Sequence, residues 1–164
     1  MLGVFKKMFG GENQIERCIA APVTGKAVSM QDVADPTVSQ EILGKGTAVV
    51  PSEGRVVAPC DGQVTMVFDT KHAVSIQTDY GAELIIHIGL DTVQLKGQYF
   101  EAHVSAGDKV KQGDLLVEFD LAKIKEAGYD VTTPVIVCNT PEFPKLESIY
   151  GMDVSAGESV IIKL

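Results

Sequence analysis

Several features that define common protein classes are missing from this 164-residue sequence. Its three cysteines, Cys18, Cys60 and Cys138, form no C-x-x-C pair, which disfavours a disulfide framework or a zinc knuckle and predicts reduced thiols in a cytoplasmic protein. No apolar run reaches transmembrane length, and no stretch has the apolar core and cleavage site of a signal peptide. The formal charge is −8 without a basic stripe, so a nucleic-acid partner is disfavoured and a basic protein partner is favoured.

Motifs for nucleotide and serine-hydrolase chemistry are also absent. The sequence has no G-x-x-x-x-G-K-[ST], no dinucleotide fingerprint and no G-x-S-x-G. A phosphoryl group used by this protein would therefore have to arrive on another protein.

Glycine and proline, separated by short runs of β-branched residues, punctuate the chain from Ile19 onward. An A-P-x-x-G-x pattern occurs at 20–28 and 57–64, and an S-A-G-[DE]-x-V pattern occurs at 105–110 and 155–160. Closely spaced turn signals of this kind predict an all-β fold, either a compact antiparallel β-sandwich or a distorted barrel.

One or two short helices are expected within this β fold. Asp35 and Pro36 form a capped start for a helix that runs through Glu41. Asp120 caps a second helix, LAKIKEA, which Gly128 ends.

The first residues differ in character from the rest of the chain. Residues 1–16 are predicted to form a flexible tail before one domain at 17–164. Within this tail, residues 1–11 carry three apolar side chains near helical spacing beside two lysines. A frayed terminus is the simplest interpretation, and a weak contact with a membrane surface is the alternative.

The stretch TKHAVSIQTDYGAELIIHIGLDTV, residues 70–93, contains two of the three histidines. Two alternating runs separated by T-D-Y-G predict a β-hairpin. With an even-numbered loop, paired residue numbers sum to 159, and His72 lies directly opposite His87 with Cβ atoms roughly 4.5–5.5 Å apart. A three-residue loop would shift the sum to 160 and place the two side chains on opposite faces. The predicted histidine pair therefore depends on the turn.

A pair of adjacent histidines fits two chemistries. In the first, one imidazole is the nucleophile for a phosphoryl group, and the other donates a hydrogen bond to its oxygens with Thr70 orienting the His72 ring. In the second, both rings bind zinc in a hydrolase, with Glu83 or Asp91 as third ligand. The second is disfavoured because H-E-x-x-H and H-x-H are absent. A non-catalytic binding or regulatory module that retains the pair is a further alternative. The third histidine, His103, has no visible partner and is expected at the surface.

Several motifs together resemble one family. T-K-H-A at 70–73 combined with E-L-I-I-H-I-G-L-D-T-V at 83–93 is similar to the glucose-type EIIA component of the bacterial phosphoenolpyruvate-dependent sugar phosphotransferase system. The similarity runs from about Ile19 to the C-terminus and includes APVTG (21–25), DP…ILGKG (35–46), PSEGRVVAPCDG (51–62) and GDKVKQGDLLVEFD (107–120).

The resemblance implies a phosphotransferase that acts as a phosphoryl carrier in sugar uptake. His87 is expected to accept a phosphoryl group from phospho-HPr, as a phosphohistidine, and to pass it to a cysteine on the EIIB domain of a sugar permease. His72 is expected to hydrogen-bond the phosphate, and Thr70 to orient His72. No cofactor is implied for this transfer, whereas zinc at His72 and His87 and binding to regulatory targets are analogies from the family.

The resemblance also implies a docking surface and a location. The protein is expected in the cytoplasm, with a peripheral position at the inner membrane face as an extension of that expectation. The docking surface is expected to be an apolar depression with a carboxylate on its rim, formed by Val38, Ile42, Leu43, Phe68, Ile85, Asp91 and Val93.

Overall fold

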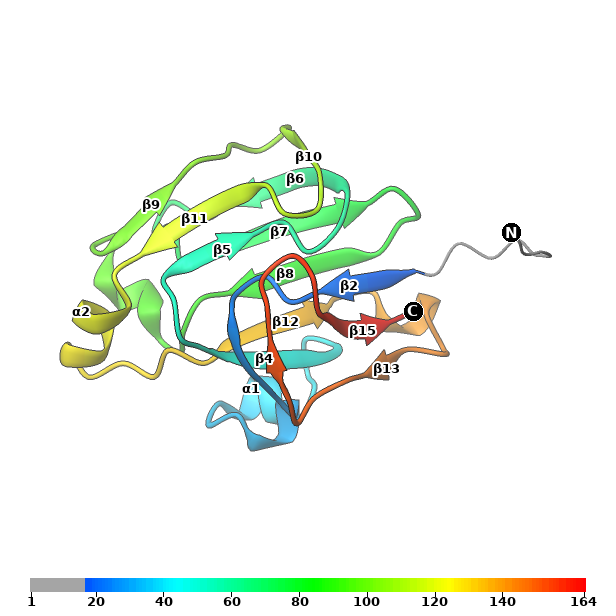
Figure 1. The fold of residues 1–164 in the computed structure, drawn as a ribbon, viewed down its shortest axis with the longest axis horizontal. Coiled ribbons are helices and arrows are strands. Elements are labelled where there is room, and N and C mark those ends of the chain that lie inside the picture. The colour runs from blue at the N-terminus through cyan, green and yellow to red at the C-terminus, as the bar shows by residue number, and fades with distance from the viewer. Residues whose placement is uncertain (1–16) are drawn as a thin grey trace.

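A computed structural model describes residues 17–164, in which the strands form three antiparallel sheets (Figure 1). The predictions of a tail at residues 1–16 and of a membrane contact at residues 1–11 lie outside the described residues. The largest sheet contains, in spatial order, β10 (Lys109–Val110), β6 (Gly62–Val67), β7 (Ala73–Thr78), β8 (Glu83–His87), β12 (Thr133–Val137), β4 (Lys45–Pro51), β3 (Gly25–Val28) and β14 (Asp153–Val154). The two smaller sheets are β5 (Arg55–Val57), β11 (Leu115–Phe119) and β9 (Phe100–Ala102), and β13 (Glu147–Ser148), β15 (Val160–Lys163) and β2 (Cys18–Ala20).

The predicted all-β class is confirmed, and the largest sheet is open. Its described edge strands, β10 and β14, do not pair with each other, so the strands form layered sheets and not a closed barrel. Side chains from all three sheets, such as Ile86, Val117 and Ile162, meet in one buried cluster. Burying a side chain of this size contributes roughly 1.5–3 kcal/mol. This cluster fixes the sheets on which the functional residues lie.

The short helices begin where the sequence predicts. The side chain of Asp35 accepts a hydrogen bond from the Thr37 N–H (2.9 Å) at the start of α1 (Pro36–Ser39). Asp120 caps α2 (Leu121–Glu126) in the same way, and Gly128 follows the helix with a φ of 93°. The first helix ends before the predicted Glu41, whose own φ is 57°. Three 3₁₀ helices complete the helical content of residues 17–164: η1 (Met30–Asp32), η2 (Thr92–Leu95) and η3 (Thr140–Glu142).

A second, smaller buried cluster lies between the η1–α1 segment and the largest sheet. Met30, Val33 and Val38 from this segment pack with Ala48 of β4 and with Ile136 of β12. Figure 1 shows α1 beside β4. The segment therefore covers part of the sheet face that points away from the main core. No helix within residues 17–164 has the length and apolarity needed to cross a membrane.

Candidate functional site

The hairpin of β7 and β8 has a different register from the one predicted. Ala73 pairs with His87, so paired residue numbers sum to 160. The loop consists of the three residues between Thr78 and Ala82. It is closed by a hydrogen bond from the Thr78 N–H to the Ala82 carbonyl (2.9 Å) and by one from the Ala82 N–H to the Thr78 hydroxyl (2.8 Å). The predicted direct opposition of His72 and His87 is therefore wrong, because the odd-numbered loop shifts the register by one residue.

The two imidazoles nevertheless lie next to each other. The ring centroids of His72 and His87 are 4.9 Å apart, and the ring planes meet at 80°. His72 lies in a bend just before β7 and follows Lys71, whose φ is 62°. In a regular strand the His72 side chain would point into the core on the same face as Val74. Because His72 lies in the bend, its side chain does not follow this alternation. The predicted proximity of the rings is confirmed, although the backbone produces it by another route.

The ring of His87 is held by the turn that follows β8. Its Nδ1 lies 2.7 Å from the carbonyl oxygen of Gly89. A carbonyl only accepts hydrogen bonds, so Nδ1 carries the hydrogen and the neutral ring has its lone pair on Nε2. Gly89 has a φ of 77°, and a Cβ at this position would lie 2.6 Å from Cγ2 of Thr92 and 2.9 Å from the carbonyl of Asp130. Glycine is therefore required to bring this carbonyl to the His87 ring.

The ring of His72 is almost fully buried, with 3% of its surface exposed. Its Nδ1 is 2.7 Å from the hydroxyl oxygen of Thr70, and the Phe68 ring contacts it edge-on at a centroid distance of 5.4 Å. Burial, followed by the neighbouring His87 ring, lowers the pKa of His72 from 6.5 to about 4. His72 is therefore neutral at pH 7 and offers one N–H group. The contact predicted between Thr70 and His72 is present.

A zinc site at the histidine pair lacks a third ligand from residues 17–164. In this range, one group of three or more histidine, cysteine or carboxylate side chains has its ligand atoms within 4.8 Å of one another. It consists of Glu101, His103 and Glu118. Neither Glu83 nor Asp91 therefore completes a three-ligand site, which a zinc hydrolase needs in addition to a bound water.

Large apolar side chains are exposed on the segments that follow α1 and β8. Ile42 and Leu43, which follow α1, are 64% and 51% exposed, and Val93 of η2 is 48% exposed. Half-buried Ile85 lies on the same outward face of β8 as His87, two residues away. We call these four residues, together with the half-buried Phe68, the apolar patch. Five of the six apolar residues predicted for a docking surface are thus at least partly accessible.

The sixth, Val38, does not belong to this surface. It is 5% exposed and packs in the small cluster with Ile136, which also contacts Ile85. Val38 therefore supports the patch from below. Met66 of β6, which the sequence pattern does not mark as accessible, is 50% exposed and pairs with Ser75 on the outward face of the sheet. A β-bulge between Val64 and Met66 turns Met66 outward, although strict alternation from the buried Val64 would point it into the core.

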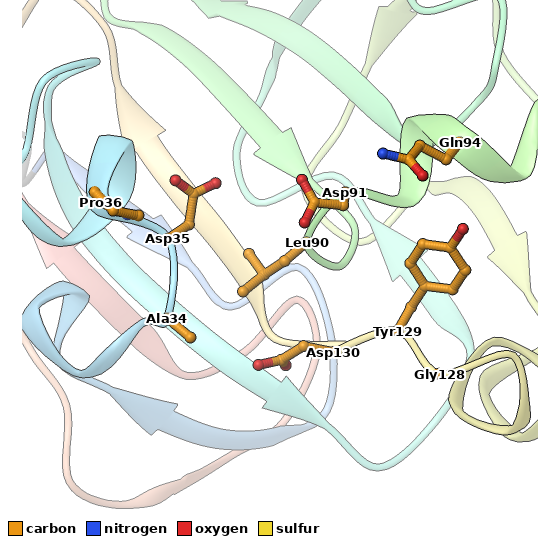
Figure 2. Close-up of a pocket in the computed structure, with 9 residues that line it drawn as sticks. All are labelled: Ala34, Asp35, Pro36, Leu90, Asp91, Gln94, Gly128, Tyr129 and Asp130. Carbon is orange, nitrogen blue, oxygen red and sulfur yellow. The ribbon is translucent and has the colours of Figure 1, made fainter.

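An acidic cleft of about 480 Å³ is lined by the start of α1, by the turn and η2 after β8, and by residues 128–130 after α2 (Figure 2). Three carboxylates line it, those of Asp35, Asp91 and Asp130. Asp35 and Asp130 each accept a local backbone hydrogen bond, whereas the side chain of Asp91 caps no N–H of η2. Asp91 also has a φ of 59°, in the left-handed region that aspartate adopts more readily than most non-glycine residues. Figure 2 shows the Asp35 and Asp91 carboxylates on either side of Leu90.

Comparisons with other proteins identify a family, relatives of similar sequence and a solved structure of similar fold. Residues 17–143 match the family described as phosphoenolpyruvate-dependent sugar phosphotransferase system, EIIA 1. The glucose-specific EIIA component of Halalkalibacterium halodurans is 44% identical, over 98% of each chain. The β-glucoside-specific EIIBCA component of Bacillus subtilis is 54% identical over 76% of this chain and 20% of its own length. The structure of the glucose permease IIA from Mycoplasma capricolum has a TM-score of 0.83 at 35% identity and covers 91% of this chain and 96% of its own.

These features define a phosphoryl carrier of the sugar phosphotransferase system. More particularly, the chain belongs to the EIIA 1 family of that system. It therefore has a transferase role in sugar transport, and the hydrolase and purely regulatory alternatives are not favoured.

Proposed function

We propose that Nε2 of His87 accepts the phosphoryl group and forms a phosphohistidine. The observation that carries this proposal is the hydrogen bond between His87 Nδ1 and the Gly89 carbonyl, which leaves the lone pair on Nε2. In the transfer, this lone pair forms the N–P bond while the bond from phosphorus to the donor atom of HPr breaks, and the electrons of that bond stay with HPr. The transfer needs no cofactor, because it depends mainly on positioning and on stabilisation of charge.

His72 has the role of a hydrogen-bond donor in this proposal. When the Thr70 hydroxyl donates to His72 Nδ1 across the observed 2.7 Å, the hydrogen of the neutral ring resides on Nε2. This N–H then stabilises an oxygen of the phosphoryl group on the neighbouring His87. Because burial lowers the pKa of His72 to about 4, the ring provides this bond without titrating near pH 7. Thr70 acts through His72 and is a positioning residue.

The second transfer passes the group to a cysteine on the EIIB domain of a sugar permease. The thiolate sulfur forms a bond to phosphorus, the N–P bond breaks, and its electron pair returns to Nε2 of His87. Relatives named as EIIBCA components support an EIIB partner, because one chain of such a relative contains a region similar to this protein. The apolar patch would contact both partners in turn, and Asp91 beside it would favour basic groups on them.

The test is the intact mass of the protein after incubation with phosphoenolpyruvate, enzyme I and HPr. The wild type should gain one acid-labile phosphate, and His87→Ala should gain none. His103→Ala is the matched control, because it removes a histidine from another surface of the same fold. A folded wild type that gains no phosphate would contradict the proposal and favour a module that only binds partners.

A further inference from the structure

Three polar side chains outside the histidine pair meet on the outer face of β9 and β11. Glu101 lies in β9 and pairs directly with Glu118 in β11. His103 follows two residues after Glu101, and its N–H donates to the Leu116 carbonyl (2.8 Å), which continues the ladder beyond β9. Residues two apart share a strand face, so both side chains of the β9 segment point to the same side as Glu118.

The distances between these side chains suit a small metal ion. Nε2 of His103 is 2.9 Å from Oε1 of Glu118, and one ligand atom from each of the three residues lies within 4.8 Å of the others. Ligands bound to Zn²⁺ at about 2.1 Å in a tetrahedron lie about 3.4 Å apart. The three exposed side chains therefore need only small rotations to bind one ion together.

The charges at this position also favour a cation. Directly opposed carboxylates repel each other across an antiparallel pair, and Glu101 and Glu118 are such a pair. On the other side of Glu118 lies Arg55 of β5, but within residues 17–164 the Glu118 carboxylate contacts His103 and forms no ion pair with Arg55. A groove of about 570 Å³ runs beside Glu101 and Glu118, and the carboxylate of Asp120 also lines it. The groove gives water access to the remaining coordination positions of an ion.

We propose that Glu101, His103 and Glu118 form a Zn²⁺ site with three protein ligands and a bound water. An imidazole with two carboxylates suits zinc better than calcium or magnesium, which prefer oxygen ligands alone. The proposal is independent of the phosphoryl chemistry and involves a different sheet. Zn²⁺ competes with the proton on the imidazole and the carboxylates, so its affinity falls as the pH is lowered.

The experiment is a titration of the full-length protein with Zn²⁺ alone, followed by NMR of the imidazole nitrogens, which reports on each histidine separately. One equivalent of Zn²⁺ should shift the ring signals of His103. Glu101→Gln and Glu118→Gln should each weaken binding at least tenfold. Glu147→Gln, at an exposed carboxylate outside the cluster, should leave the affinity unchanged.

Two results would overturn the proposal. The first is an unshifted His103 at stoichiometric Zn²⁺, including the case in which the shifts are confined to His72 and His87. The second is a His103 shift that is equally strong in both glutamine variants, since the ion would then be held by the imidazole alone. His72→Gln should retain the wild-type response at His103, because the proposed site does not include the histidine pair. Each variant's amide spectrum would show that it is folded.

Discussion

His87 and His103 both lie at the end of a strand, but their neighbours differ in charge. The neighbours of His87 include a second imidazole, which is neutral, and Ile85 on the same face of β8. The neighbours of His103 are two carboxylates. At 4 Å and an effective dielectric constant of 20, two unit charges interact by about 4 kcal/mol. An anionic phosphoryl group is therefore compatible with the first histidine and repelled at the second, whereas a cation has the opposite preference.

Removal of the His87 imidazole tests this difference between the two histidines most directly. His87→Ala should abolish phosphate uptake from phospho-HPr. No other side chain in residues 17–164 has both a free imidazole lone pair and a neutral imidazole beside it. His103→Ala should retain the wild-type rate. Phosphate incorporation measured by intact mass and by rapid quench distinguishes the variants. Label found on His103 in the wild type would show that carboxylate neighbours do not exclude the phosphoryl group.

Removal of the His72 imidazole should affect the second transfer more than the uptake of phosphate. His72→Gln should still accept one phosphate, but transfer to the EIIB cysteine should slow by roughly 100-fold, the cost of losing one well-placed donor to a developing charge. The glutamine amide can donate a hydrogen bond, but its flexible side chain is not held by Thr70. Single-turnover transfer from isolated phosphoprotein to EIIB measures this step. Equal rates for the variant and the wild type would remove His72 from the mechanism.

Burial of His72 also predicts a difference in stability with pH. The folded-state pKa of about 4 lies below the unfolded value of 6.5, so the unfolded chain binds the proton first as the pH falls. Stability is thus complete above pH 6.5, decreases as the pH is lowered, and stops decreasing from this source near pH 4. Between pH 6.5 and 5 the loss is about 1.6 kcal/mol, because the slope approaches 1.36 kcal/mol per pH unit only below the unfolded pKa.

His72→Gln should lack this part of the pH dependence. Urea unfolding of the wild type and the variant at pH 6.5 and 5 provides the measurement, and the difference between the two proteins cancels the contribution of the carboxylates. Parallel pH profiles would mean that the imidazole is charged or solvated in the folded protein.

The sequence was sufficient for the fold class and the helix caps, because these depend on local patterns. The proximity of the two histidines was predicted from a register that the structure does not have, and the bend at Lys71 and His72 produces it instead. Asp35 and Asp120 precede the two helices, and an aspartate side chain at this position caps a helix in almost any context. The register was not predictable, because it depends on whether Thr78 or a neighbour closes the loop. Met66 was missed for a related reason: a bulge reverses its face, and no residue type marks that bulge.

The partners of His103 were missed for another reason. The sequence showed no partner for this histidine, and its expected surface position is confirmed. Its contact with Glu118 spans 15 positions and arises from the pairing of β9 with β11. Only a correct strand alignment brings these residues together, and turn signals alone do not provide it. Val38 was misplaced because an apolar residue in a short helix has the same sequence signature whether it faces a partner or the core.

A charge placed in the apolar patch should weaken the binding of phospho-HPr by a modest factor. Ile42 is the most exposed large apolar side chain of the apolar patch, and a partner that covers it would desolvate any charge placed there. Ile42→Glu should therefore raise the KM for phospho-HPr by about tenfold, equivalent to about 1.4 kcal/mol, with little change in kcat. Tyr150→Glu is the matched control, because Tyr150 is 51% exposed and lies outside the patch, in the connection between β13 and β14. Steady-state transfer at varied HPr concentration separates the two parameters. If both variants raise the KM equally, the net negative charge of the protein governs its association with phospho-HPr, and the apolar patch does not. The two histidines would then differ only in the charge of their surroundings.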